Sequence, residues 1–404
     1  MNKVRSLDDL EIVSNTVDHI LTLFSGGLDS TYVLDALSHW NVKVTALAVD
    51  LGEDVEIEQL ELITKHYGYD LIVIDAKNEF AELYISKAVK SQAMYLRDYP
   101  VSSSLSRPLI ARKAVEIANE LNCGAIIHTA NQSQNSLRRL NGAINHLGFK
   151  GFYGSPYEFS AISRDEKILK LFHSGLVNFK SRTVSGDANL WCREFESGTL
   201  EDPENLKISN SIFTWSQFEP SNHFENDTIS VEFEKGKPVK VNGQDMNLVE
   251  IIKHINIKVG SYEIGRYIGF DHLDDDEKVI EIREAPAAYI LFQSYKLLAT
   301  ASLSTKVLKM KANLDETWTQ EAVEGRWDSE LQQACFQFIS HVSQKITGVV
   351  SFKLSKGYAL ATSIIAKNPK YLKNKDLWEI DIANKRSCNS LKSTFVKLSK
   401  QEVI

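Results

Sequence analysis

The stretch that decides the fold is His19–Tyr32, which reads HILTLFSGGLDSTY. Its apolar run Ile20–Phe24 is typical of a short buried strand in a parallel sheet. The run breaks at Ser25-Gly26-Gly27, and apolar residues from Val33 to Leu37 then recur at helical spacing. Because glycine has no Cβ, successive backbone N–H groups can converge on an anion, and the positive end of the helix adds to the attraction. The stretch therefore predicts a strand, a turn and a helix that together cradle phosphate.

Asp29 lies in the first turn of that expected helix, beside the hydroxyls of Ser25, Ser30 and Thr31. A carboxylate next to phosphates is repelled unless a cation lies between them, so Asp29 indicates Mg²⁺ bound together with a polyphosphate. The Walker A pattern G-x-x-x-x-G-K-[ST] is absent. The alternative without a ligand is a tight Gly-Gly turn capped by Ser25.

The pattern S-G-G-x-D-[ST] resembles the pyrophosphate loop of the ATP pyrophosphatases, which release pyrophosphate and transfer AMP to an oxygen. The resemblance implies ATP and Mg²⁺ as cofactors, Asp29 and Ser25 as catalytic residues, and Asp29 as the contact of magnesium pyrophosphate. The loop residues that it implies for ATP and pyrophosphate are Phe24, Ser25, Gly26, Gly27, Leu28, Asp29, Ser30 and Thr31. These enzymes perform several chemistries, so the loop alone does not name a reaction.

Composition excludes several other classes of protein. The chain has 404 residues, a net charge of −7 and 25% charged residues, as in an ordinary globular protein of two or three domains rather than a dedicated nucleic-acid binder. Its four cysteines are widely spaced, which predicts neither a zinc module nor a disulfide framework. No signal peptide and no apolar run of the ~20 residues that span a membrane are found. We therefore expect a cytoplasmic protein with small-molecule substrates and neither nucleic-acid nor membrane partners.

Strands and helices alternate after the loop. The expected elements are the strands Val42–Val49, Leu71–Asp75 and Gly124–His128 and the helices Glu56–Tyr67, Glu79–Met94 and Arg164–His173. This rhythm predicts a parallel sheet with helices on both faces. Ligands of such sheets bind at the carboxyl ends of the strands, where Val49 either faces an adenine or is a plain core residue.

Two further segments narrow the resemblance to the argininosuccinate synthase family. Residues 95–113 (YLRDYPVSSSLSRPLIARK) are similar to the family pattern Y-x-x-G-[TS]-[SA]-L-[AS]-R-P-x-I-A-[RK]-K. Residues 185–203 (SGDANLWCREFESGTLEDP) are similar to S-x-D-E-N-L-W-x-R-S-x-E-x-G-x-L-E-D-P without any insertion, which excludes most other pyrophosphatases. In the first segment we expect Arg107-Pro108 to open a helix, with proline near its first position. The resemblance runs from about Leu21 to the end of the chain.

The resemblance to this family implies further contacts with each ligand. For ATP it adds Val49, His128 and Thr129. For the two amino acids, citrulline and aspartate in the family, the implied residues are Tyr99, Ser104, Asn131, Asn135, Ser136, Arg139, Ser185, Glu194 and Arg283. The pair Arg138-Arg139 either clamps a carboxylate, which a guanidinium fork matches, or lies on a solvated helix face.

Several of these positions differ in chemical type from the family pattern. The changes are Ser136 for a carboxylate, Glu194 for a hydroxyl, Ile264 for a carboxylate and Arg283 for a phenol. A lost carboxylate removes a charge-assisted hydrogen bond to a substrate ammonium. The loop after Gly124–His128 has also lost three of the family's glycines, so its backbone cannot keep the family's shape, and the alternative is that a differently shaped loop does the same job. These changes predict a substrate pair other than citrulline and aspartate.

Beyond Pro203 the patterns favour an α+β arrangement. The expected elements are a hairpin of Thr228–Glu234 with Val239–Val241, a short helix Leu248–His254, a long apolar helix Tyr289–Leu308, and a hairpin of Val349–Leu354 with Tyr358–Ala361. The acidic run 274–277 is interpreted as a solvated loop tip. A weakly amphipathic helix is expected at 385–403, and the resemblance implies that such a tail embraces a neighbouring subunit of a homotetramer or dimer.

We interpret the chain as an α/β protein. A parallel-sheet nucleotide-binding domain with a pyrophosphate loop, of the adenine nucleotide alpha hydrolase type, is expected at residues 1–180. An α+β synthetase and multimerisation domain at 181–380 and a C-terminal oligomerisation helix at 381–404 are expected to follow.

The expected activity is that of an ATP-dependent carbon–nitrogen ligase. It would adenylate a ureido or amide oxygen, release pyrophosphate and let an amino-acid amine displace AMP, on a pair differing from citrulline and aspartate. One alternative is a genuine argininosuccinate synthase of arginine biosynthesis. Others are another ATP pyrophosphatase, disfavoured because no cysteine pair or zinc cluster is present, and an inactive homologue, disfavoured by the intact loop.

Overall fold

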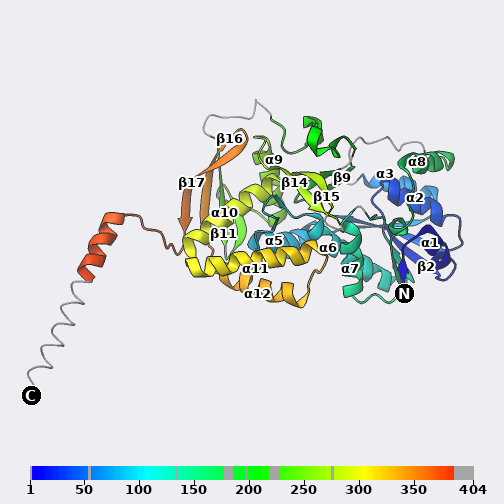
Figure 1. Cartoon of the computed structure of the whole chain (residues 1–404), viewed down its shortest axis with the longest axis horizontal. Helices are drawn as coiled ribbons and strands as arrows, with labels where there is room; N and C mark the ends of the chain where they lie inside the picture. Colours follow the sequence, from blue (N-terminus) through cyan, green and yellow to red (C-terminus); the bar gives the residue numbers. More distant parts are fainter. Residues whose placement is uncertain are drawn as a thin grey trace, which may run out of the picture.

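A parallel sheet forms one end of the molecule (Figure 1). The computed structural model describes residues 2–52, 56–132, 134–176, 185–196, 198–218, 227–273 and 277–385. Six of the described strands form this sheet, in the order β1 (Lys3–Val4), β8 (Phe152–Gly154), β7 (Ala125–Ile127), β2 (His19–Leu23), β3 (Lys43–Asp50) and β4 (Asp70–Asp75). All neighbouring pairs run parallel, as expected from the alternation of strands and helices.

Helices cover both faces of this sheet. On one face, α1 (Leu7–Ser14), α2 (Leu28–Leu37) and α3 (Ile57–His66) pack against the β2 residue Ile20. On the other face, α6 (Ser103–Glu120) and α7 (Ser136–His146) pack against its neighbour Leu21. The two side chains point to opposite faces because successive residues of a strand alternate. A further helix, α8 (Arg164–His173), has the predicted bounds and packs beside α2.

Two predicted helix bounds in the first half are wrong. The helix expected at Glu79–Met94 comprises α4 (Lys77–Phe80), a π-helical turn (Ala81–Ile85) and α5 (Ser86–Lys90). It ends early because the chain turns at Gln92, which is left-handed with φ 48°, before the hairpin of β5 (Met94–Tyr95) and β6 (Tyr99–Pro100).

The second wrong bound is the start of α6, which begins at Ser103 rather than at Arg107. Pro108 lies in the second turn of the helix, and the serines before it form the first turn. These serines are buried against the rest of the protein, so tertiary packing extends the helix beyond the point where proline chemistry alone would start it. The earlier start turns Ser103 and Ser106 toward the cavity described below.

Two antiparallel sheets belong to the second half of the chain. One has the order β14 (Arg266–His272), β15 (Lys278–Glu284), β10 (Arg193–Glu196) and β9 (Ser185–Ala188). The other has the order β13 (Gln244–Asp245), β12 (Lys237–Val241), β11 (Thr228–Glu234), β16 (Gly348–Ser355) and β17 (Tyr358–Ala366). The hairpins β11–β12 and β16–β17 confirm the two that the sequence predicts.

The helices of this half are longer than expected or divided. They are α9 (Leu248–Gly260), α10 (Pro286–Ser302), α11 (Thr305–Val323) and α12 (Glu330–Ser343). The single apolar helix expected at Tyr289–Leu308 breaks at Leu303-Ser304, where Leu303 is extended and Ser304 begins α11 as its N-cap. Short 3₁₀ turns occupy Pro156–Glu158, Gly198–Leu200, Pro203–Asn205 and Asn210–Ile212.

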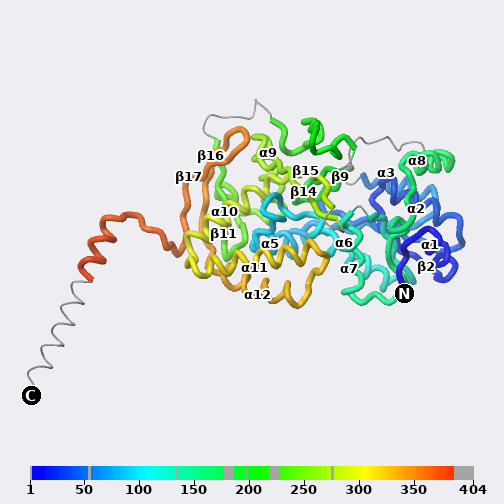
Figure 2. The backbone as a smooth tube through the Cα atoms, viewed as in Figure 1, coloured from blue at the N-terminus to red at the C-terminus, as the bar shows by residue number. Residues whose placement is uncertain are grey.

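The largest hydrophobic core joins the two halves. Phe80 and Val89, from the first half, pack in one cluster with Ile251 and Leu291. Figure 2 shows the same arrangement, with α5 and α6 running beside α11 and α12. Packing therefore places part of residues 76–109 with the second half, and the domain bounds 1–180, 181–380 and 381–404 stay predictions.

Some expectations concern residues outside the described part. Residues 274–276 of the acidic run and 386–404 of the C-terminal helix lie there, whereas residues 375–385 are helical. Ser185 belongs to β9 by its backbone, and its side chain is not described. No helix in the described part of the chain is long and apolar enough to cross a membrane.

Candidate active site

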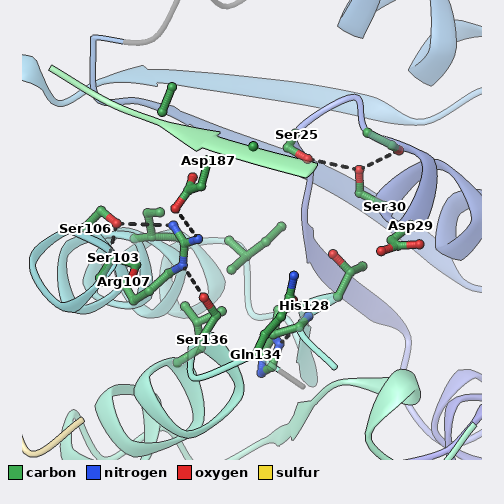
Figure 3. A pocket seen from close by; sticks show the side chains of 18 of the residues that line it. Ser25, Asp29, Ser30, Ser103, Ser106, Arg107, His128, Gln134, Ser136 and Asp187 are labelled. Carbon is green, nitrogen blue, oxygen red and sulfur yellow. Dashed lines mark hydrogen bonds and ion pairs between the residues drawn. The ribbon is translucent and has the colours of Figure 1, made fainter. Parts of the chain in front are cut away.

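A cavity of about 820 Å³ opens at the carboxyl ends of β2, β3 and β7 (Figure 3). The chain leaves β2 toward β3 on one side and reaches β7 on the other, which is the point where open α/β sheets bind ligands. Residues of β9, β10, β14 and β15 form the opposite wall. The cavity therefore lies between the parallel sheet and the first antiparallel sheet of the second half.

The loop Ser25–Ser30 lines one side of the cavity. Gly26 has φ +71°, a left-handed conformation that strains other side chains, and a Cβ there would lie 2.5 Å from Leu60 Cδ2, so the position favours glycine. Gly27 is the N-cap of α2 and supplies no side-chain cap, which leaves the first backbone N–H groups of the helix open to an anion. This geometry fits the phosphate cradle that the sequence predicts.

The hydroxyls near this loop do not all face the cavity. Thr31 Oγ1 donates a hydrogen bond to Gly27 O at 2.8 Å, and Thr31 is fully buried. Ser30 Oγ donates to the same carbonyl oxygen at 3.1 Å and lies 3.4 Å from Ser25 Oγ. Ser25 and Ser30 line the cavity, and Thr31 does not.

Asp29 lies at the start of α2 with 40% of its side chain exposed. Its Oδ1 lies 2.7 Å from Lys167 Nζ of α8, and no partner of Oδ2 is found among the described residues. The described residues contain no group of three or more His, Cys, Asp or Glu side chains that could hold a metal by themselves. The Oδ2 of Asp29 beside the phosphate loop, unpartnered within the described part of the chain, is the type of donor that Mg²⁺ bound with nucleotide phosphates takes from a protein.

Next to the loop, His128 and Thr129 directly follow β7, and both line the cavity. Burial lowers the pKa of His128 to about 4, so the imidazole is neutral at pH 7. Its Nε2 lies 3.1 Å from Asn141 Oδ1, and its Nδ1 accepts a hydrogen bond from Ala130 N. Val49 lies in the cavity wall and also packs on the core, so both of its predicted roles remain compatible with its position.

Arg107 joins three elements across the cavity, as Figure 3 shows. Its Nη2 lies 2.6 Å from Asp187 Oδ2 of β9, and its Nε donates to Ser136 Oγ of α7 at 3.0 Å. Its Nη1 donates to Ser106 Oγ at 3.2 Å. Neither Arg107 nor Asp187 is among the predicted site residues, although both match the family segments, and that match was the signal that could have found them.

Arg139 and Asn135 converge on Asp271 of β14. Arg139 is buried and donates from Nη1 to Ser103 Oγ at 2.7 Å. Its Nη2 lies 3.9 Å from Asp271 Oδ2. Asn135 Nδ2 donates to Asp271 Oδ2 at 2.6 Å. Arg138 contacts His272 Nε2 at 2.9 Å. Neither Arg138 nor Arg139 therefore lies on a solvated helix face, which was one of the two roles that the sequence left open for this pair.

Glu194 and Glu281, in the wall opposite the phosphate loop, form an ion cluster with Arg283 behind it. Arg283 Nη1 lies 2.7 Å from Glu194 Oε1, and its Nε donates to Glu281 Oε2 at 3.0 Å. Its guanidinium also lies over the ring of Tyr99, 4.1 Å from the centroid. The Tyr99 hydroxyl donates to Phe270 O. Arg283 and Tyr99 therefore interact inside the protein and do not line the cavity, whereas Glu194 and Glu281 do.

The carboxyl groups around this cluster are hard to ionise. Burial raises the pKa of Glu194 to about 7. Burial, followed by the charge of Glu194, raises the pKa of Glu196, whose only described hydrogen bond comes from Gln134 at 3.4 Å. Burial also raises the pKa of Glu281. A cation at this end of the cavity would thus favour the ionised form of these carboxyl groups.

The shift at Glu194 makes stability depend on pH. Because its pKa is about 7 when folded and 4.5 for an ordinary glutamate, the folded chain binds the proton more tightly than the unfolded chain does. The stabilisation from that proton is complete below about pH 4.5 and is lost as the pH rises through about 7. Between pH 5 and 8 the wild type should therefore lose on the order of 2 kcal/mol more unfolding free energy than Glu194→Gln. Denaturant unfolding at both pH values measures this, with exposed Glu204→Gln as control; a pH-independent difference between wild type and Glu194→Gln would contradict it.

Most predicted site residues line this one cavity. They are Phe24, Ser25, Gly26, Gly27, Leu28, Asp29, Ser30, Val49, His128, Thr129, Asn135, Ser136, Arg139 and Glu194. The structure does not bring the described side chains of Thr31, Tyr99, Ser104, Asn131 and Arg283 to the cavity surface. Further charged or polar lining residues, which are not among the predicted site residues, are Glu56, Gln59, Ser103, Ser106, Arg107, Gln134, Arg164, Asp187, Asn189, Glu196, Asp271 and Glu281.

Comparison with known proteins adds to this geometry. An arginosuccinate synthase N-terminal HUP domain model matches residues 19–168, and an arginosuccinate synthase C-terminal domain model matches residues 184–398. The argininosuccinate synthase of Pyrococcus furiosus is 32% identical over 87% of this chain and 86% of its own. That of Oenococcus oeni is 32% identical over 92% and 91%. The chain belongs to the argininosuccinate synthase family.

Family membership confirms the resemblance seen in the sequence motifs, and with it an α/β fold that begins with a nucleotide-binding domain. It implies an ATP-dependent ligase. Among solved structures, an NH3-dependent NAD synthetase from Campylobacter jejuni matches 43% of this chain and 75% of its own at 15% identity. Its TM-score of 0.29 is too low to bear on fold or function.

Proposed function

We propose that this family member joins an amine to an activated carbon in two steps. An acceptor oxygen, from a ureido or amide group, bonds to the α-phosphorus of ATP while the bond to the pyrophosphate oxygen breaks. The amine nitrogen then bonds to the activated carbon, loses a proton, and the bond from that carbon to the AMP oxygen breaks. One observation carries the proposal: the Ser25–Ser30 loop and the polar residues around Arg107 line the same cavity.

The residues at the phosphate end would bind and orient rather than form covalent intermediates. Ser25 and the open N–H groups of α2 would hold pyrophosphate, and Asp29 would hold the magnesium that accompanies it. Bound with the nucleotide, Mg²⁺ supplies neutralisation of charge on the phosphates. Neutral His128 and Thr129 would lie beside the nucleotide. Catalysis would come from holding the reactants together and stabilising developing charge.

The substrate pair has two candidates. The relatives' names favour citrulline and aspartate, hence a genuine argininosuccinate synthase, and they give this candidate more support than a changed pair. The side chains of this chain favour a changed pair. Glu194 lies at the cavity with a raised pKa, and Tyr99 is covered by Arg283 instead of facing the cavity. We propose that the acceptor and amine differ from citrulline and aspartate, a choice that kinetic comparison decides.

The remaining contacts are proposals of the same kind. Asn135 and Ser136 would meet the amine donor, and Arg139 and Glu194 the acceptor; these four line the cavity. Roles for Ser104, Asn131 and Ser185 rest on the family resemblance alone. A homo-oligomer is proposed too, since exposed apolar side chains gather on β17 and residues 371–380, among them Leu360 and Trp378. A cytoplasmic location is supported by the unpaired Cys123, Cys192 and Cys335 in the described part.

Product analysis tests the reaction type. With ATP, magnesium and a panel of ureido and amide acceptors paired with amino acids, ³¹P NMR should show AMP and pyrophosphate in equal amounts. The α-phosphorus is attacked in the proposed reaction, so ADP and inorganic phosphate should not form. A wild-type enzyme that yields ADP with its best substrate pair would contradict the proposal.

A further inference from the structure

Lys167 lies on the buried face of α8, next to the phosphate loop. Its Nζ lies 2.7 Å from Asp29 Oδ1 and 4.1 Å from the centroid of the Tyr157 ring. The Tyr157 hydroxyl donates a hydrogen bond to Asp29 O at 3.0 Å. Lys167 and Tyr157 thus fix both the side chain and the backbone of the acid in the phosphate loop.

The position of this lysine differs from that of its helix neighbours. Lys167 and Leu171 are the buried residues of α8 and lie on one face because they are four residues apart. Lys170, one turn further on, is exposed. A buried ammonium is costly unless a partner compensates its lost hydration. Asp29 is that partner, and the pairing links residues 138 positions apart in the chain.

We infer that Lys167 is a positioning residue for Asp29 and that its ammonium, together with Mg²⁺, neutralises this carboxylate beside the phosphates. The inference rests on the proposed function of the loop. An ammonium on Oδ1 lowers the repulsion between Asp29 and a phosphate anion and leaves Oδ2 for the metal. Arg164, one turn earlier on α8, lines the cavity and adds a second cation at this end. The affinity of the loop for pyrophosphate therefore depends less on a divalent cation than it would if Asp29 had no ammonium partner.

Calorimetric titration of the full chain with inorganic pyrophosphate tests this, once with Mg²⁺ and once in EDTA. The measured quantity is the ratio of the dissociation constant in EDTA to that with Mg²⁺. Lys167→Met and Lys167→Gln should each raise this ratio by about tenfold or more, since both remove the charge of a charge-assisted contact. Lys167→Arg should keep the ratio near the wild-type value. Lys170→Met, which removes an exposed lysine from the same helix, should not change it.

A second background shows whether the lysine acts through Asp29. In Asp29→Asn, which has no carboxylate charge, adding Lys167→Met should leave the ratio unchanged. An unchanged ratio in Lys167→Met and Lys167→Gln with Asp29 intact would overturn the inference. A wild-type ratio in Lys167→Gln would also overturn it, because a structural hydrogen bond would explain that result. So would an equal rise of the ratio in the Asp29→Asn background, because a direct contact of Lys167 with phosphate would explain it. If the wild type binds no pyrophosphate with Mg²⁺, the proposed function fails instead.

Discussion

Replacing Asp29 by asparagine is expected to slow ATP–pyrophosphate exchange by about 10²- to 10³-fold. Asparagine has the shape of aspartate and can still accept a hydrogen bond from Lys167, so the loop should keep its conformation. It lacks the charge that would hold magnesium beside the phosphates, and that loss removes several kcal/mol of transition-state stabilisation. The open N–H groups of α2 remain, so nucleotide binding should weaken less than turnover.

Exchange of labelled pyrophosphate into ATP, measured at saturating acceptor, checks this result. Asp165→Asn is the matched control, since Asp165 is an exposed acid in the first turn of α8. It should keep wild-type exchange, and thermal unfolding should show both variants folded. Wild-type turnover in Asp29→Asn would remove Asp29 from the catalytic residues and would leave the loop a turn without a metal.

Citrulline with aspartate is expected to be a poor substrate pair. If two contacts are mismatched at about 1–3 kcal/mol each, its kcat/KM should lie roughly thirtyfold to twenty-five-thousandfold below that of the best pair. The reason lies in buried charges. Glu194 stands at the cavity where a hydroxyl is expected, and Arg283 binds both Glu194 and Glu281 instead of presenting a phenol. A site with unmatched polar groups rejects a substrate that leaves them unpaired.

Kinetics with an amino-acid panel at fixed ATP decides between the two substrate proposals. If citrulline with aspartate reaches about 10⁴ M⁻¹s⁻¹ or more and no other pair exceeds it, the chain is a genuine argininosuccinate synthase and the changed pair is wrong. A double variant, Glu194→Ser with Arg283→Tyr, should move the preference toward citrulline, with exposed Glu204→Ser as control. Arg283→Tyr alone should be less stable than the double, because it leaves both Glu194 and Glu281 without their cation, whereas Glu194→Ser keeps the pair of Arg283 with Glu281.

Local patterns predicted much of the phosphate end. Residues 19–37 form a strand, a Gly-Gly turn and a helix. These depend on contacts between near neighbours and on the φ of Gly26, and adjacent residues determine both. The hairpins β11–β12 and β16–β17 were predictable for the same reason. The start of α6 was not, because burial of the serines before Pro108 depends on segments far along the chain.

The sequence by itself determined the alternation of strands and helices in the parallel sheet, the phosphate loop and the position of Asp29 at a helix start, since each follows from hydrophobic period, glycine freedom and helix polarity. Only the tertiary structure decided which charges meet. Lys167 reaches Asp29 across 138 residues, and Arg107 reaches Asp187 across 80. Arg283 turns to Glu194 and away from the cavity. Such pairs form because packing excludes water and brings opposite charges within about 3–4 Å, and no local pattern encodes that distance.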